Sequence, residues 1–275
     1  MKHIAVKGAN VPALGLGTWR LSGGSCYEAV RTALELGYRH IDTAEMYGND
    51  AEVGRAIRDS GIARAEIFLT TKVPPGKLSA KDAKRSAEDS LKRLGLPYVD
   101  LLLVHWPSGE APLGETLQAF AELKAAGKTR FIGVSNFTVA LLTEAIERHG
   151  ADLLCNQVEY HPYLSQKPVL AAVRRHGMML TAYAPVAKGR AAGDGVLEAV
   201  GRKYGKSAAQ VSLRWLIEQD NVAAIPKASS RAHLAANLDI FDFALSPEDR
   251  ARIDRLQGGG RLLDVPGWSP DWDRA

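Results

Sequence analysis

The sequence predicts an α/β protein in which eight parallel strands and their helices form a (β/α)8 TIM barrel. Eight short apolar runs alternate with amphipathic segments along almost the whole chain, and successive runs end 22 to 44 residues apart. That spacing is typical of one strand followed by one crossover helix. The runs are continuously apolar rather than alternating, as parallel strands buried on both faces require. Eight such units favour a closed barrel over an open doubly wound sheet, with residues 1–275 as one domain.

The predicted strands cover residues 13–17, 38–42, 67–72, 99–105, 130–135, 153–157, 178–183 and 222–227. Amphipathic segments between them, such as 25–37 and 113–127, predict the crossover helices. The widest gap, between the last two strands, contains two helical patterns, at 195–205 and 207–219. We therefore expect an additional or broken helix there.

Both ends of the chain carry extra segments. Residues 3–14 read as a two-stranded hairpin around Lys7 and Gly8 that plugs one end of the barrel. Ser246 can cap a final helix with Pro247 in its first turn. The tail from Gly258 is rich in Gly, Pro and Trp and lacks periodicity, so we expect a loop with a functional role.

Composition excludes several classes of protein. Hydrophobic residues make up 46% and charged residues 24%, which is typical of a globular chain. No run approaches the ~18 apolar residues of a membrane span, and the N-terminus lacks a targeting pattern, so a cytoplasmic location is expected. Cys26 and Cys155 stand far apart, outside any C-x-x-C motif, which predicts neither a disulfide framework nor a metal site.

The basic residues do not indicate a nucleic-acid partner. The net charge is +4, but the densest basic group, within residues 81–93, alternates with acidic residues on one amphipathic helix. This pattern is typical of a solvated helix face.

In a (β/α)8 barrel the active site forms at the carboxyl ends of the strands, where each apolar run turns polar. The residues at these ends are Gly17, Thr18, Trp19, Asp42, Tyr47, Lys72, His105, Trp106, Ser135, Asn136, Gln157, Tyr183 and Lys227. This set predicts a rim with an acid, a lysine, a tyrosine and a histidine close together.

Each of these four residues also has a purely structural interpretation. Asp42 could cap a loop, Lys72 could face solvent, and His105 could be a satisfied core histidine. Tyr47 could simply pack in its loop. Their occurrence together at three consecutive strand ends favours a functional site, because unpaired ionisable residues are costly to bury there.

The four residue types fit proton transfer to a carbonyl oxygen. A nearby ammonium lowers the pKa of a phenol, so Lys72 is expected to tune Tyr47, with Asp42 holding the lysine charged. His105 would donate a hydrogen bond to the substrate oxygen. No side chain carries hydride, so a nicotinamide cofactor is implied.

Two other cofactor arrangements have weak support. The nearest approach to a G-x-G-x-x-G motif, residues 15–20, ends in Arg20 and opens no helix, which argues against a Rossmann domain. No H-x-H pair occurs and the histidines are scattered. A metal-dependent barrel hydrolase is therefore only an alternative hypothesis, and no metal is expected.

Six sequence segments together resemble the aldo-keto reductases. The segments are HIDTAEMYGNDAEVG (40–54), LTTKV (69–73), YVDLLLVHWP (98–107), IGVSNF (132–137), NQVEYHPY (156–163) and AAIPKASSRAHLAANLDIFDF (223–243). The resemblance extends over about residues 3–274. It is strongest to the small bacterial 2,5-diketo-D-gluconate and methylglyoxal reductases, which share the compact Trp-bearing tail.

The resemblance implies a monomeric, NADPH-preferring enzyme that binds its cofactor first and reduces small aldehydes and ketones. Asp42, Tyr47, Lys72 and His105 would be the catalytic tetrad, with Tyr47 as general acid. The cofactor-binding residues would be Gly17, Thr18, Trp19, Ser135, Asn136, Gln157, Tyr183, Ala184, Val186, Gly189, Lys227, Ser229, His233 and Asn237. Trp19, Trp106 and Trp268 would line the substrate pocket beside Tyr47 and His105.

Four positions depart from the family pattern. Ala228 and His233 stand where Ser or Thr and Arg are usual, and Asp50 and Ala184 replace the usual Glu and Ser. The first two changes remove groups that contact the ribose 2′-phosphate or adenine, so NADH use is expected beside NADPH. Ser229 and Arg231 are candidates to compensate. A non-catalytic nucleotide-sensing subunit is the second alternative hypothesis.

Overall fold

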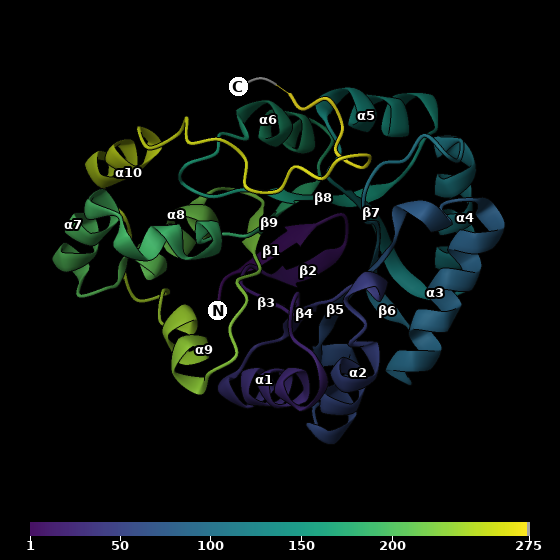
Figure 1. The fold of residues 1–275 in the computed structure, drawn as a ribbon, viewed down its shortest axis with the longest axis horizontal. Helices are drawn as coiled ribbons and strands as arrows, with labels where there is room; N and C mark the ends of the chain where they lie inside the picture. Colours follow the sequence, from purple (N-terminus) through teal and green to yellow (C-terminus); the bar gives the residue numbers. More distant parts are fainter. Residues whose placement is uncertain (274–275) are drawn as a thin grey trace.

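Eight parallel strands form one sheet in the computed structural model, which describes residues 1–273 (Figure 1). The strands are β3 (Leu16–Gly17), β4 (His40–Asp42), β5 (Phe68–Val73), β6 (Val99–Val104), β7 (Thr129–Ser135), β8 (Leu153–Glu159), β9 (Met179–Tyr183) and β10 (Val222–Ala224). All eight predicted strands are present. Every residue of β5, β6 and β8 is buried, which explains why their sequences read as continuous apolar runs.

The sheet closes on itself between its first and last strands. Leu14 and Ala224 form a parallel bridge, and the Gly15 amide donates to the Ala224 carbonyl at 2.9 Å. The Gly17 amide donates to Pro226 O at 3.1 Å. A Cβ atom at Gly17 would lie 2.8 Å from Ile225 O, so this seam needs glycine. The predicted (β/α)8 barrel is confirmed.

Helices cover the outside of the barrel. They are α1 (Gly23–Leu36), α2 (Asp50–Asp59), α3 (Ala80–Leu94), α4 (Leu113–Ala125), α5 (Val139–Thr143), α6 (Lys167–Arg175), α7 (Gly195–Tyr204), α8 (Ala208–Glu218), α9 (Arg231–Leu238) and α10 (Pro247–Asp254). The two helices α7 and α8 lie between β9 and β10, as the wide gap predicted. Ser246 caps α10 by accepting a hydrogen bond from the Asp249 amide at 3.1 Å, as expected.

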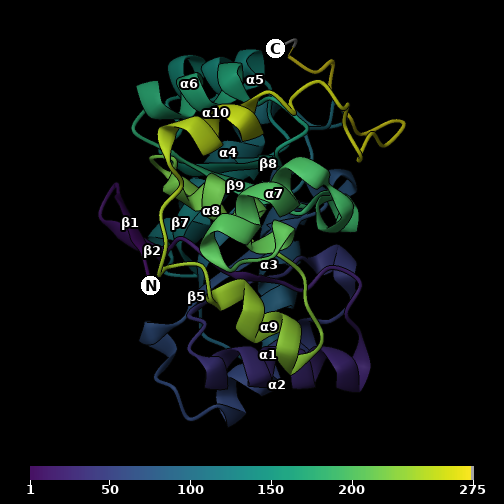
Figure 2. The same cartoon turned by 90° about the vertical axis from the view of Figure 1, so that its left-hand side faces the viewer.

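The terminal segments lie on opposite sides of the barrel (Figure 2). Strands β1 (His3–Val6) and β2 (Ala9–Pro12) form the predicted antiparallel hairpin, with Lys7 and Gly8 both at positive φ in its turn. The tail from Gly258 contains no helix or strand as far as Asp273. In Figure 2 this tail, drawn in yellow, projects on the side away from the hairpin.

Candidate functional site

A buried ion pair joins the carboxyl ends of two neighbouring strands. Asp42 ends β4 and Lys72 lies one residue before the end of β5, and Lys72 Nζ is 2.5 Å from Asp42 Oδ1. The ammonium also donates to the Thr43 carbonyl at 2.8 Å. The Lys72 side chain is 0% exposed, and burial lowers its pKa more strongly than Asp42 raises it. The carboxylate is therefore the main group that keeps this lysine charged.

Tyr47 faces the ion pair from the short 3-10 turn Glu45–Tyr47, which follows β4. Its hydroxyl lies 3.4 Å from Lys72 Nζ. Burial, and then the negative charge of Asp42, raise the Tyr47 pKa well above its ordinary value. The lowering of this pKa that we expected from Lys72 is not seen in the protein alone, where burial is the larger cause of the shift and Asp42 the second. Tyr47 is held as a protonated phenol.

A second hydrogen-bond network fixes the turn that carries Tyr47. Thr43 Oγ1 donates to Asn49 Oδ1 at 2.7 Å, and Asn49 Nδ2 donates to Thr18 O at 3.0 Å. Thr18 Oγ1 in turn donates to the Asp42 carbonyl at 3.0 Å. Thr43 and Asn49 were not singled out from the sequence, where a threonine and an asparagine beside a turn have no distinguishing signal. They tie the tyrosine loop to the strand that carries Asp42.

His105 directly follows β6 and completes the group of four. Its ring centroid lies 5.7 Å from that of Tyr47, at an interplanar angle of 75°. Burial, and then the charge of Lys72, lower the His105 pKa well below its ordinary value. Its Nδ1 atom is buried and has no hydrogen-bond partner within residues 1–273. The imidazole is therefore neutral and retains hydrogen-bonding capacity for another group.

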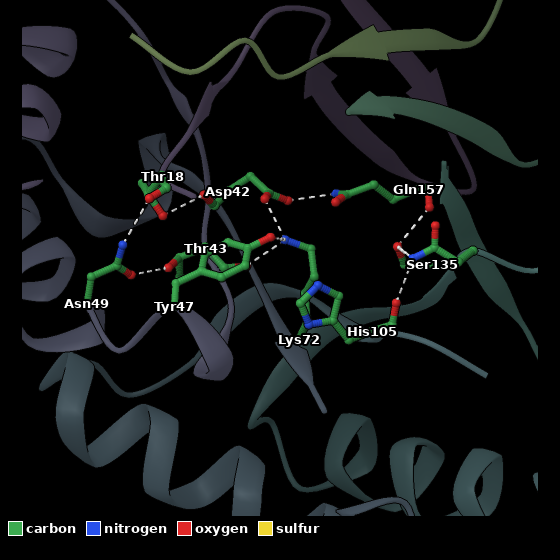
Figure 3. Close-up of polar contacts among 10 residues, drawn as sticks. Thr18, Asp42, Thr43, Tyr47, Asn49, Lys72, His105, Ser135 and Gln157 are labelled. Carbon is green, nitrogen blue, oxygen red and sulfur yellow. Dashed lines mark hydrogen bonds and ion pairs between the residues drawn. The ribbon is translucent and has the colours of Figure 1, made fainter. Parts of the chain in front are cut away.

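The amide and hydroxyl residues predicted at the next strands continue this network (Figure 3). Gln157 Nε2 donates to Asp42 Oδ2 at 2.7 Å, and Ser135 Oγ donates to the Gln157 carbonyl at 2.8 Å. Asn136 Nδ2 donates to His105 O at 3.0 Å, while Tyr183 Oη donates to Asn136 Oδ1 at 2.8 Å. The polar side chains at the carboxyl ends of the strands from β4 to β9 thus form one connected hydrogen-bond network.

The loop after β9 has an unusual backbone. Ala184, Ala187, Lys188 and Gly189 all have positive φ values, between 48° and 96°. Left-handed residues turn successive amides toward a common point, an arrangement that favours anions. Val186 O accepts from the Gly189 amide at 3.0 Å, which stabilises the turn. The predicted residues of this loop therefore form one compact turn beside Tyr183.

The predicted adenosine-end residues lie apart from the four catalytic candidates. Lys227 and Ser229 are exposed in the segment after β10, and His233 and Asn237 are on α9. His233 is exposed in the first turn of that helix. Arg231, the other candidate cation, pairs with Glu35 of α1 at 3.1 Å. Lys227, Ser229 and His233 are thus accessible on the segment that follows β10 and on the start of α9.

An aromatic cluster links the tail to the strand ends. The ring of buried Trp106 lies 6.5 Å from that of Trp268 and 6.2 Å from that of Trp272. Trp272 was missed from the sequence, although the Trp-rich tail was noted. Trp19, which was also predicted to line the pocket, is 37% exposed and lies under the Arg20 guanidinium at 4.3 Å.

No group of three His, Cys, Asp or Glu residues within residues 1–273 could hold a metal ion. Across the same residues, none of the helices combines the length and apolar character that a membrane crossing requires.

Comparisons with known proteins agree on one family. Residues 13–257 match the aldo/keto reductase family model. The chain is 41% identical over 266 residues to methylglyoxal reductase DkgB of Escherichia coli O157:H7, covering 96% of this chain and 99% of the relative. The crystal structure of a candidate 2,5-diketo-D-gluconic acid reductase B superposes with a TM-score of 0.97 and 45% identity, covering 100% and 98% of the two chains. A Bombyx mori aldo-keto reductase in complex with NADP gives a TM-score of 0.90 and 33% identity, covering 98% and 97%.

Proposed function

This chain belongs to the aldo/keto reductase family, and from that premise we propose that it catalyses NAD(P)H-dependent reduction of small aldehydes and ketones. The observation that carries the proposal is the convergence of Asp42, Tyr47, Lys72 and His105 at adjoining strand ends. One charged pair, one protonated phenol and one neutral imidazole meet there. This combination fits proton delivery to a carbonyl oxygen.

The residues present fit a nicotinamide dinucleotide. The half-buried Tyr183 ring lies beside the left-handed turn at 184–189. In our proposal Ser135, Asn136 and Gln157 hold the carboxamide, Tyr183 stacks on the nicotinamide, and Ala184, Val186 and Gly189 cradle the pyrophosphate. Gly17, Thr18 and Trp19 border the cofactor in this proposal. When bound, the cofactor supplies the hydride that no side chain can supply.

Tyr47 acts as the general acid. Its phenol is protonated at neutral pH because burial and Asp42 raise its pKa. As charge develops on the substrate oxygen, the proton passes from Tyr47 Oη to that oxygen, and the adjacent ammonium of Lys72 stabilises the phenolate that remains. Asp42 keeps that ammonium charged and oriented through the 2.5 Å contact.

His105 orients the substrate. A neutral imidazole donates one hydrogen bond to the carbonyl oxygen without adding a second cation beside Lys72. The Tyr47 and His105 rings meet edge to face, so both can approach one oxygen atom. Trp19, Trp106 and Trp268 form the walls of the pocket in this proposal, which suits small carbonyl compounds of the methylglyoxal or 2,5-diketo-D-gluconate type.

We infer a preference for NADPH that is not strict. Lys227, Ser229, His233 and Asn237 are assigned to the adenosine end, and Lys227 has no ion-pair partner among residues 1–273. A lysine free of internal partners can attract a 2′-phosphate. The usual arginine is replaced by His233, which lacks the permanent charge and the bidentate donor edge of a guanidinium, so discrimination against NADH weakens.

A steady-state assay tests this proposal. Purified protein is mixed with NADPH and methylglyoxal, and cofactor oxidation and alcohol formation are both measured. Stoichiometric consumption of NADPH and carbonyl is expected. Tight NADPH binding without turnover on any aldehyde would instead indicate the nucleotide-sensing alternative.

A further inference from the structure

The turn that carries Tyr47 is flanked by two acidic residues. Glu45 begins the turn Glu45–Tyr47, and Asp50 begins helix α2 shortly after it. The side chain of Asp50 is 1% exposed and that of Glu45 is 12% exposed. Burial is the largest cause that raises the Asp50 pKa, and the negative charge of Glu45 raises it further. Buried carboxylates need a compensating partner, so a group outside the turn must hold these two in place.

Arg93, near the end of α3, is the cation that joins the two acids. Its Nε and Nη2 atoms lie 3.0 Å and 2.9 Å from Asp50 Oδ2, and Nη2 lies 3.6 Å from Glu45 Oε1. Asp50 Oδ1 is buried without a hydrogen-bond partner among residues 1–273, so Arg93 is the main compensation for this carboxylate. The guanidinium therefore bridges the start of the turn and the start of α2, and Tyr47 lies between these two points in the chain.

Glu45 has two further partners outside the turn. Lys77 Nζ, in the segment after β5, donates to Glu45 Oε1 at 2.6 Å, and Ser86 Oγ of α3 donates to Glu45 Oε2. Ser86 and Arg93 are seven residues apart on α3, so they share one face of that helix. Arg93 belongs to the basic group within residues 81–93, which the sequence assigned to a solvated face. Its head group nevertheless contacts the segment that carries the tyrosine.

Helix α3 gives this contact a fixed support. Helix α2 packs so closely on the end of α3 that a Cβ atom at Gly54 would lie 1.8 Å from Leu94 O. Gly54 follows Asp50 by four residues, so both lie on the same face of α2. Arg58 Nη1 donates to the same Leu94 carbonyl. Backbone packing and the ion pair thus hold the start of α2 against the end of α3.

We propose that Arg93 is a positioning residue for Tyr47: by joining Glu45 and Asp50, its guanidinium fixes the turn that holds the phenol within reach of the carbonyl oxygen. This inference rests on the proposed reductase function. The contact of Tyr47 Oη with Lys72 Nζ, at 3.4 Å, is longer than a strong hydrogen bond (Figure 3). The place of the hydroxyl therefore depends on the backbone of the turn, which Arg93 attaches to α3 from outside the barrel.

The test compares Arg93→Met, which removes the charge, with Arg93→Lys, which keeps one. Arg130→Met is the matched control. Arg130 is 50% exposed, against 42% for Arg93, and its Nη1 atom lies 3.0 Å from Asp100 Oδ1. The Asp100 side chain is 1% exposed, like that of Asp50. Asp100 is the second residue of β6, at the opposite end of the barrel strands from Tyr47. All variants are assayed well below their measured unfolding temperatures.

We expect Arg93→Met to lower the single-turnover rate of NADPH oxidation by saturating methylglyoxal about 10- to 100-fold, because a displacement of about 1 Å at a reacting group costs up to about 100-fold. The KM for methylglyoxal and the Kd for NADPH should change by less than about threefold. Arg93→Lys should recover part of the rate, and Arg130→Met should stay within about twofold of the wild type. A wild-type rate in Arg93→Met, or an equal loss in Arg130→Met, would overturn the proposal.

The Tyr47→Phe background separates positioning of the hydroxyl from a general structural role. If Arg93 acts through that hydroxyl, adding Arg93→Met to Tyr47→Phe should lower the residual rate by less than about twofold, because the group that Arg93 places is already absent. A loss as large as in the wild-type background would show that the guanidinium supports the site in another way, and would overturn the proposal.

A measurement without turnover distinguishes failure of the reductase proposal from failure of this one. Protein labelled with [13Cζ]tyrosine is studied by NMR, and the resonance that disappears in Tyr47→Phe is assigned to Tyr47. That resonance should shift or broaden in Arg93→Met and stay unchanged in Arg130→Met. An unchanged Tyr47 resonance in Arg93→Met, or an equal change in Arg130→Met, contradicts the positioning role whatever the activity of the protein.

Discussion

Neutralising Asp42 should destabilise the protein because it leaves Lys72 as an unpaired buried ammonium. Lys72 Nζ lies 2.5 Å from Asp42 Oδ1, and the lysine side chain has no exposed surface. Removing one partner of such a pair costs about 3 to 5 kcal/mol. The Thr43 carbonyl, 2.8 Å from Nζ, remains in Asp42→Asn and offsets part of that cost. We therefore expect a loss of about 3 kcal/mol, at the lower end of this range.

The double variant isolates the charge pair. In Asp42→Asn/Lys72→Met neither charge remains, so no unpaired ion is buried. The double variant should be more stable than the sum of the two single losses predicts, by roughly 2 kcal/mol or more. The losses of turnover should also be non-additive. Each single variant is impaired, and the double variant is little worse than either, because the two groups act as a unit.

Thermal and urea unfolding of the four proteins at pH 7 measure this effect. A loss of about 3 kcal/mol corresponds to a fall in Tm of roughly 6 to 12 °C for a domain of this size. Asp152→Asn is the control, because Asp152 forms ion pairs with Lys7 and Lys124 on the surface and is 63% exposed. Its cost should stay within about 1 kcal/mol. Additive losses in the cycle, or equal costs for Asp42→Asn and Asp152→Asn, would refute the reasoning.

Three other variants test separate parts of the account. His233→Arg should tighten NADPH binding about 5- to 30-fold and leave NADH binding nearly unchanged in fluorescence titrations. No gain in NADPH affinity in this variant would remove His233 from the phosphate site. Glu159, which ends β8, accepts from the tail amides of Leu262 at 2.7 Å and Leu263 at 2.9 Å. Glu159→Gln removes one of these two acceptors, so it should lower the unfolding free energy by about 1 to 3 kcal/mol and raise substrate KM more than the NADPH Kd; an unchanged KM would contradict this anchoring role. Burial lowers the pKa of His40 and His105 in the folded protein, so the unfolded chain binds more protons than the folded one below about pH 6.5. The free energy of unfolding should therefore fall by up to about 1.4 kcal/mol per histidine for each pH unit of acidification. Urea unfolding between pH 7 and pH 5.5 should show a smaller slope in His105→Asn, and identical slopes would exclude that histidine as a cause.

The barrel could be predicted because its strands are buried on both faces. Continuous apolar sequences in β5, β6 and β8 follow directly from that burial. Strand lengths were less predictable at the seam. The predicted strands at 13–17 and 222–227 are shorter in the structure, where they are β3 (Leu16–Gly17) and β10 (Val222–Ala224). The barrel closes there through one isolated bridge and separate backbone hydrogen bonds rather than a full ladder.

The four catalytic candidates could be placed together because parallel strands share one carboxyl edge. Their electrostatics could not be predicted, because the Tyr47 pKa is raised first by burial and then by Asp42, and the sequence does not show how deeply that side chain is buried. The role of Glu159 as an acceptor for the tail amides was also hidden. Glu159 reads as part of a strand, and the amides it accepts lie 103 and 104 residues away in sequence.

The most direct test of the proposed mechanism is the turnover of Tyr47→Phe, which removes the proton donor and keeps the ring against His105. Carbonyl reduction is measured with saturating NADPH under conditions where the chemical step limits the rate, and NADPH affinity is measured in parallel. We predict a fall in turnover of about 100-fold or more with cofactor binding retained. A variant that kept more than about a tenth of wild-type turnover would show that Tyr47 is not the general acid.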